Sequence, residues 1–162
     1  MRHMESAGLL MFRRTIEGLE VLLAHPGGPF WESRHEGAWG IPKGGANSGE
    51  DWLAAAIREF REETGFDSQP PYLPLGQIKQ RGGKVVHAWA FEGDLDPAAI
   101  QSSTVTIEWP IRSGRQIVVP EIDRAAFFSI DAARPLMNPA QVEFLDRLTA
   151  LEERGKSSVK NT

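Results

Sequence analysis

The sequence predicts a single α/β domain in which helices cover a mixed β-sheet. Two pairs of short apolar segments, within residues 6–25 and 73–92, are each joined by a turn and read as hairpins. Residues 49–64 show the apolar spacing of an amphipathic helix, and a second apolar-periodic segment follows Asn138-Pro139. Hairpins combined with helices favour a mixed sheet over a purely parallel one.

The first half of the chain predicts two strands, a long loop and a helix. The strands cover residues 6–14 and 19–25, and the loop covers 26–37. A short strand at 39–41 leads into Pro-Lys-Gly-Gly. The helix over 49–64 is capped by Asn47 or Ser48, and Gly65 ends it.

The second half predicts strands at 73–80 and 84–92, which turn at Gly82-Gly83. Further strands are expected at 104–109 and 125–130, with a loop at 111–114 between them and a short helical turn at 131–134. The apolar positions after Pro139 define a C-terminal helix. The expected domain covers residues 5–152, and 153–162 form a flexible polar tail.

Composition narrows the classes of function. The 162 residues carry a net charge of −4, which disfavours binding to a nucleic acid polymer but leaves room for a small anionic substrate. Without cysteine there is no disulfide or thiolate site. No apolar run approaches the length of a membrane span. We therefore expect a cytoplasmic protein that does not bind membranes. No exposed interface can be read from the sequence, so a monomer and a homodimer are equally expected.

Three acids lie on one face of the predicted helix over residues 49–64. Glu59, Glu62 and Glu63 are spaced i, i+3 and i+4, so they are neighbours on the helix surface. A solvated acidic face is the ordinary interpretation of such a pattern. However, like charges at this spacing destabilise a helix, and a divalent cation would offset that repulsion. Oxygen-only ligands suit Mg²⁺, with Mn²⁺ as an alternative.

The spacing of the whole segment from Gly44 to Phe66 resembles the Nudix box of the Nudix hydrolase family. Gly44 is followed after five residues by Glu50, and after seven more by the run REFREETGF from Arg58 to Phe66. The resemblance implies an α/β/α sandwich with a mixed central sheet. It also implies Mg²⁺-dependent cleavage of a pyrophosphate bond in a nucleoside diphosphate linked to another group.

The same resemblance implies roles for individual residues. Glu59, Glu62 and Glu63 would bind metal, with the Gly44 carbonyl as an added ligand. Glu50 and Arg58 would form a pair that orients these acids. A carboxylate must also take a proton from the attacking water, and the family varies in which one does so. Glu59 is one candidate for this base and an acid from a later loop is the other.

Glu121 is the preferred later acid, because residues 118–133 resemble the part of diadenosine tetraphosphate hydrolases where a loop glutamate precedes an aromatic strand. Glu108 is the weaker candidate, and an ordinary loop acid is the alternative for both. Trp39 to Gly44 resembles the Trp-x-Pro-Lys-Gly approach of diadenosine polyphosphate hydrolases. Lys43 can meet a phosphate as a point charge, whereas Trp39 is expected in the core.

Further substrate-binding residues are expected in two loops. Phe30 or Trp31 can stack on a purine, although packing under the loop is the alternative. Arg81 and Lys84 flank the Gly-Gly turn, where they reach a polyphosphate or form a solvated hairpin tip.

The sequence therefore predicts a pyrophosphohydrolase whose substrate is a small nucleotide, with diadenosine tetraphosphate, cleaved to ATP and AMP, as the leading candidate. A sanitising nucleoside triphosphate pyrophosphohydrolase is the main alternative. A non-catalytic nucleotide-binding regulator of the same fold is the third hypothesis. It is weakened because every acid of the Arg-Glu-x-x-Glu-Glu set is present.

Overall fold

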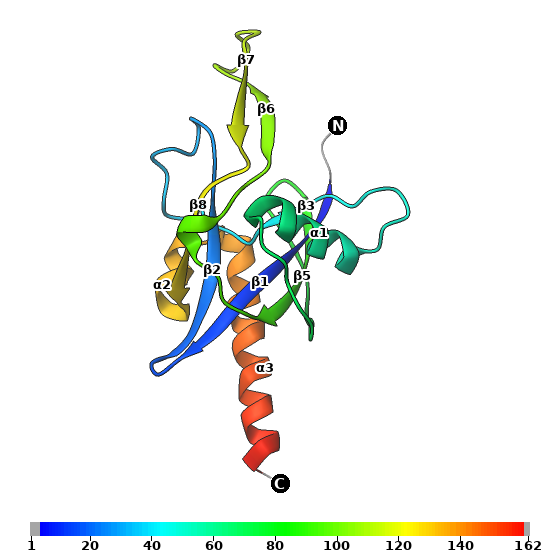
Figure 1. Cartoon of the computed structure of the whole chain (residues 1–162), viewed down its shortest axis with the longest axis vertical. Helices are drawn as coiled ribbons and strands as arrows, with labels where there is room; N and C mark the ends of the chain where they lie inside the picture. Colours follow the sequence, from blue (N-terminus) through cyan, green and yellow to red (C-terminus); the bar gives the residue numbers. More distant parts are fainter. Residues whose placement is uncertain (1–3, 161–162) are drawn as a thin grey trace.

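A curved sheet between two helical layers forms the body of the protein in the computed structural model, which describes residues 4–160 (Figure 1). The main sheet has the strand order β4-β5-β1-β2-β8, and β3 pairs with β1. β1 and β5 are parallel, while the other pairings are antiparallel. The predicted mixed sheet is thus confirmed. Its strands are β1 (Glu5–Thr15), β2 (Gly18–Pro26), β3 (Lys43–Gly44), β4 (Leu73–Lys79), β5 (Val85–Glu92) and β8 (Ile122–Ser129).

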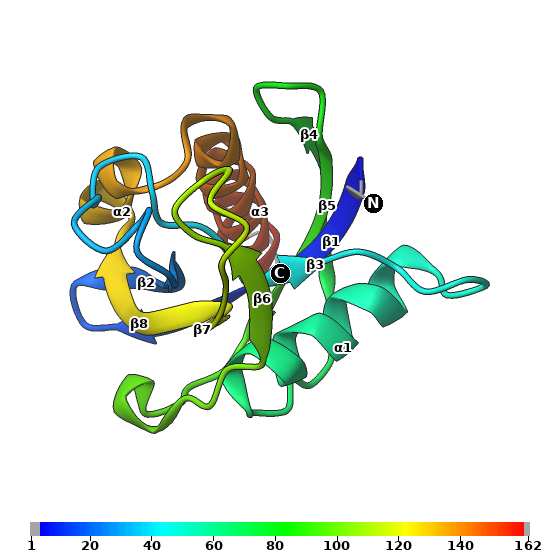
Figure 2. The ribbon, with the colours of Figure 1, turned by 90° about the horizontal axis from the view of Figure 1, so that it is seen from above.

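The helices lie on opposite faces of this sheet, as the view from above shows (Figure 2). α1 (Trp52–Thr64) covers one face, and α2 (Ile130–Leu136) and α3 (Val142–Lys160) cover the other. A hydrophobic core lies on each face of the sheet. Alternate side chains of β1 pack into these two cores, because successive residues of a strand point to opposite faces. Leu9 packs with Phe60 of α1, whereas Leu10 packs with Phe144 of α3. This is the predicted α/β/α sandwich.

The boundaries of three predicted elements were wrong. In the predicted strand at 39–41, Trp39 and Gly40 form only isolated bridges, and the strand that follows is β3. Asp51, rather than Asn47 or Ser48, caps α1, since its carboxylate accepts from the Ala54 N–H at 2.7 Å. The segment expected to be a tail from residue 153 continues α3 as helix through Lys160.

The predicted strand at 104–109 is half of a hairpin that the sequence analysis did not anticipate. β6 (Thr104–Glu108) pairs with β7 (Gln116–Pro120) in a separate two-stranded sheet. This hairpin projects from one end of the molecule (Figure 1). Two short 3₁₀ turns, η1 (Pro97–Ala99) and η2 (Pro139–Gln141), complete the fold. Within residues 4–160, no helix has the length and apolar character needed to cross a membrane.

Candidate active site

Arg58 organises the acidic face of α1. Its guanidinium donates twice to the Glu50 carboxylate at 2.9 Å, and also reaches Glu59 at 3.0 Å and Glu62 at 3.1 Å. A further bond at 2.8 Å goes to the Gly45 carbonyl. These bonds raise the pKa of Arg58, with Glu50 as the main cause, and they lower the pKa of Glu50. The pairing of Glu50 with Arg58 that the resemblance implied is present.

Two of the predicted metal ligands are withdrawn from solvent. The Glu63 side chain is buried and accepts from the Lys43 backbone N–H at 3.1 Å. Burial raises the pKa of Glu63 well above its ordinary value, and repulsion from Glu59 and Glu121 adds to the rise. The pKa of Glu59 is also raised, chiefly by burial and against the opposing effect of Arg58. In both groups the surroundings disfavour the charged carboxylate relative to its protonated form.

Gly44 brings the loop against Glu59. An added Cβ at Gly44 would lie 2.2 Å from the Glu59 Cδ and 2.4 Å from both carboxylate oxygens. Only glycine can occupy this position without moving Glu59. This contact gives a physical reason for the glycine that opens the Gly44–Phe66 segment.

Glu62 is the most exposed of the three acids. Its side chain is 47% exposed and turns toward Arg58. Over residues 4–160, no three His, Cys, Asp or Glu side chains are grouped closely enough to hold a metal ion. Glu59 and Glu63 instead face a common cavity together with Glu121.

That cavity, which we call the phosphate cavity, has a volume of about 690 Å³. Arg81 and Lys84 from the β4–β5 turn line it together with Glu59 and Glu63. The predicted cations, Arg81 and Lys84, and the predicted acids, Glu59 and Glu63, therefore line the same cavity. The role of both cations in substrate binding stays a prediction.

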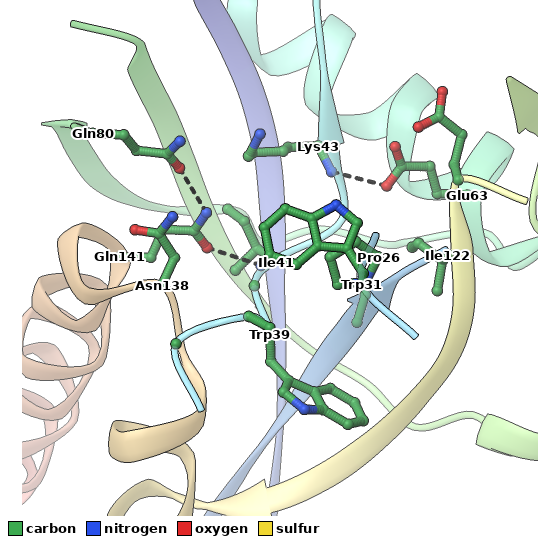
Figure 3. Close-up of a pocket in the computed structure, with 15 residues that line it drawn as sticks. Pro26, Trp31, Trp39, Ile41, Lys43, Glu63, Gln80, Ile122, Asn138 and Gln141 are labelled. Carbon is green, nitrogen blue, oxygen red and sulfur yellow. Dashed lines mark hydrogen bonds between the residues drawn. The ribbon is translucent and has the colours of Figure 1, made fainter. Parts of the chain in front are cut away.

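A second cavity of about 280 Å³, the Trp31 cavity, adjoins the first and shares Lys43, Glu63 and Glu121 with it. Figure 3 shows the Trp31 indole near Lys43 and Pro26, while the Trp39 indole points away from Lys43 and Glu63. Trp39 packs edge-on against His25 and Phe128, as expected for a core residue.

Lys43 stands at the junction of the two cavities. Burial is the main cause that lowers its pKa to about 8, and the charge of Lys84 lowers it further. Glu63, Glu121 and Glu59 oppose this effect. Lys43 is therefore mostly protonated at pH 7, and it can meet a phosphate as a cation.

Two glutamines that the sequence analysis missed also line the cavities. Gln141 is buried, accepts from the Ile41 N–H at 3.0 Å and donates to Gln80 at 2.9 Å (Figure 3). A Cβ on Gly40 would approach the Gln141 side chain to 2.8 Å. No local motif marks these residues, because they are brought together from η2, the β4–β5 turn and the loop before β3.

His25 fixes the position of the loop that carries Trp31. No sequence pattern indicated this role of His25. Its buried ring lies 2.9 Å from an Asp123 carboxylate oxygen through Nδ1 and 2.6 Å from the Arg34 carbonyl through Nε2. Which of the two ring nitrogens donates depends on the tautomer of His25. The contact ties the loop over residues 26–37 to β8, close to Glu121.

We expect Asp123→Asn to destabilise the protein by about 1–2 kcal/mol, because the part-buried hydrogen bond of the His25 ring loses its anionic partner. Thermal unfolding measures the loss. Asp67→Asn is the control, since Asp67 pairs with Arg61 on the exposed surface and should change stability little. Equal melting temperatures for the two variants would contradict this role of His25 and Asp123.

Fold and site together define an α/β/α sandwich with an acidic, arginine-braced helix beside a cation-lined cavity. The family profile described as NUDIX domain matches residues 2–148. The chain belongs to the NUDIX family, as its sequence predicts.

Among curated proteins, the RNA pyrophosphohydrolase of Caulobacter vibrioides is 47% identical over an alignment of 53 residues that covers 30% of this chain and 31% of that protein. The RNA pyrophosphohydrolase of Agrobacterium fabrum is 31% identical over 107 residues, covering 51% of this chain and 63% of that protein. The chain thus spans less than two thirds of the length of these relatives.

Solved structures share the fold. The C. elegans Ap4A hydrolase in a binary complex superposes with a TM-score of 0.66 at 22% identity, covering 91% of this chain and 98% of that one. The NUDIX domain of Shewanella oneidensis NrtR, complexed with ADP ribose, has a TM-score of 0.62 at 13% identity, covering 93% and 88%. At these identities the likeness establishes the sandwich architecture alone.

Proposed function

We propose that the protein is a divalent-metal-dependent pyrophosphohydrolase that cleaves a dinucleoside polyphosphate, with diadenosine tetraphosphate giving ATP and AMP. The observation that carries the proposal is the continuity of the two cavities. The phosphate cavity supplies acids and cations, and the Trp31 cavity supplies an indole beside them. A nucleotide has the same two parts, a polyanion joined to an aromatic base.

The donor set fits a hard cation such as Mg²⁺, for which Mn²⁺ is a substitute. Glu63 is a buried carboxylate and Glu59 a partly buried one, and a cation would relieve the repulsion between them. The Gly44 carbonyl would add a third ligand. Glu62 would add a fourth after its side chain turned away from Arg58. When bound, the metal would neutralise pyrophosphate charge and make a bound water more acidic.

The residues of the chain have separate tasks in this proposal. Lys43, Arg81 and Lys84 bind the phosphate oxygens, and Trp31 stacks on one base. Water oxygen bonds to one phosphorus of the anhydride, the bridging P–O bond breaks, and the second phosphate group leaves with its electron pair. Glu121 takes the proton of the water. We prefer Glu121 to Glu59 as the base because Arg58 already holds Glu59 and Gly44 packs against it.

The names of the curated relatives favour a second candidate substrate, the 5′-triphosphate end of an RNA. The net charge of −4 argues against an extended contact with a polymer. A terminal triphosphate could nevertheless enter the phosphate cavity alone.

A substrate panel with product analysis separates these candidates. With Mg²⁺ present, we expect kcat/KM for diadenosine tetraphosphate to exceed that for ordinary nucleoside triphosphates and for a triphosphorylated oligonucleotide by about tenfold or more. That difference corresponds to about 1.4 kcal/mol of transition-state binding. Faster cleavage of several triphosphates, or of the oligonucleotide, would make the dinucleotide assignment wrong.

A further inference from the structure

The β6–β7 hairpin has one apolar face turned toward the loop that carries Trp31. Val105, Ile107 and Val119 alternate with exposed residues along the two strands, and these three are partly or fully buried. A two-stranded hairpin has little stability alone, so this face is expected to pack against something. It faces Gly28, Phe30 and Trp31 of the 26–37 loop.

The two surfaces do not close on each other. A hollow of about 250 Å³, which we call the hairpin groove, remains between the loop and the hairpin. A Cβ at Gly28 would come within 3.4 Å of the Val119 side chain and 3.6 Å of Ile107, so the absent side chain helps to keep the groove open. The Phe30 ring, 42% exposed, stands edge-on to Trp31 with the ring centroids 4.9 Å apart.

The groove is continuous with the proposed active site. Pro26, Trp31 and Glu121 line both the hairpin groove and the Trp31 cavity. Apart from Glu121, the groove is lined by apolar side chains and glycines. A molecule that extends from the phosphate cavity past Glu121 would therefore place an uncharged, flat, apolar group there.

We propose that the hairpin groove binds the second nucleobase of a dinucleoside polyphosphate. One base then lies in the Trp31 cavity and the other in the groove, with Trp31 between the two positions. This inference rests on the proposed function and makes it more specific: the hairpin selects dinucleotides over mononucleotides that carry the same phosphate chain.

The experiment compares diadenosine tetraphosphate with adenosine 5′-tetraphosphate, which has the same number of phosphates and only one base. Wild type should bind the dinucleotide about tenfold more tightly, as expected for one stacked base. Ile107→Glu places a charge in the groove and should remove this preference. Phe30→Ala, at an exposed position, tests the other wall if Ile107→Glu does not fold. Dissociation constants are measured by calorimetry and KM values by product release.

Val118→Glu is the matched control, because Val118 is 67% exposed on the same hairpin and does not line the groove. The control should keep the preference for the dinucleotide. Equal affinity of wild type for the two ligands, or an equal preference in the groove variants and wild type, would overturn the proposal. Absence of cleavage of either ligand would instead refute the proposed function, and the calorimetric comparison would still decide whether the groove holds a base.

Discussion

Replacement of Glu63 by Gln is expected to lower turnover strongly while stabilising the metal-free protein. The buried carboxylate is a proposed metal ligand, so its loss should lower kcat by about 10³-fold, or about 4 kcal/mol. The same carboxylate is an unfavourably placed anion without metal, and a neutral amide can still accept from the Lys43 N–H. Differential scanning calorimetry in chelator should therefore show a higher Tm for Glu63→Gln.

The gain should depend on pH in a defined direction. Because the folded protein holds the Glu63 proton more tightly than the unfolded chain, wild-type stability falls as pH rises above about 4.5, toward the raised pKa. The Tm difference should be small at pH 4.5 and larger at pH 8. A gain of 1 kcal/mol corresponds to about 2–4 °C for a chain of this length.

Glu62→Gln is the control for this first prediction. Glu62 is a proposed metal ligand, so its replacement should lower turnover. Because its side chain is half-exposed, the replacement should not raise the Tm. A lower Tm of metal-free Glu63→Gln at pH 8 would show that the carboxylate stabilises the fold, contrary to the role derived from its burial and neighbours.

Gly44→Ala should lower turnover by about 10²-fold or more in a protein that still folds. The new Cβ would lie within 2.4 Å of the Glu59 carboxylate oxygens, so Glu59 or the loop must move. Displacement of a proposed metal ligand by even 1 Å is enough for a loss of this size. Kinetics over a range of Mg²⁺ concentrations should show weaker apparent metal affinity.

Gly155→Ala is the matched control, because a Cβ there meets nothing within 4 Å. Its turnover should equal that of wild type. Unchanged kinetics in Gly44→Ala would mean that Glu59 has no fixed place in the reaction.

The sequence predicted those parts of the fold that local patterns determine. The 3.6-residue spacing of Leu53, Ile57 and Phe60 identified α1, and Gly82-Gly83 identified the β4–β5 turn. The cap of α1 was misplaced because several residues before the helix, Asn47, Ser48 and Asp51 among them, are good caps, and only the geometry selects Asp51. β7 was missed although Gln116 to Val119 follow a turn, since the run is short.

The candidate site divides in the same way. Glu50, Arg58, Glu59 and Glu63 lie within one continuous segment, so their spacing alone indicated their proximity. His25 with Asp123, and Gln80 with Gln141, are 98 and 61 residues apart in the chain. Such contacts depend on strand order and register, which single-residue patterns do not encode. The groove beneath the β6–β7 hairpin belongs to this second class.

The most direct test of the central assignment is hydrolysis of diadenosine tetraphosphate by wild type and Glu62→Gln, with Mg²⁺ and with chelator, and with products separated by chromatography. The proposed metal-dependent pyrophosphohydrolase predicts ATP and AMP in equal amounts from wild type with Mg²⁺. It predicts almost no product in chelator or from Glu62→Gln. Turnover by Glu62→Gln equal to that of wild type, or nucleotide binding without cleavage in wild type, would contradict the assignment.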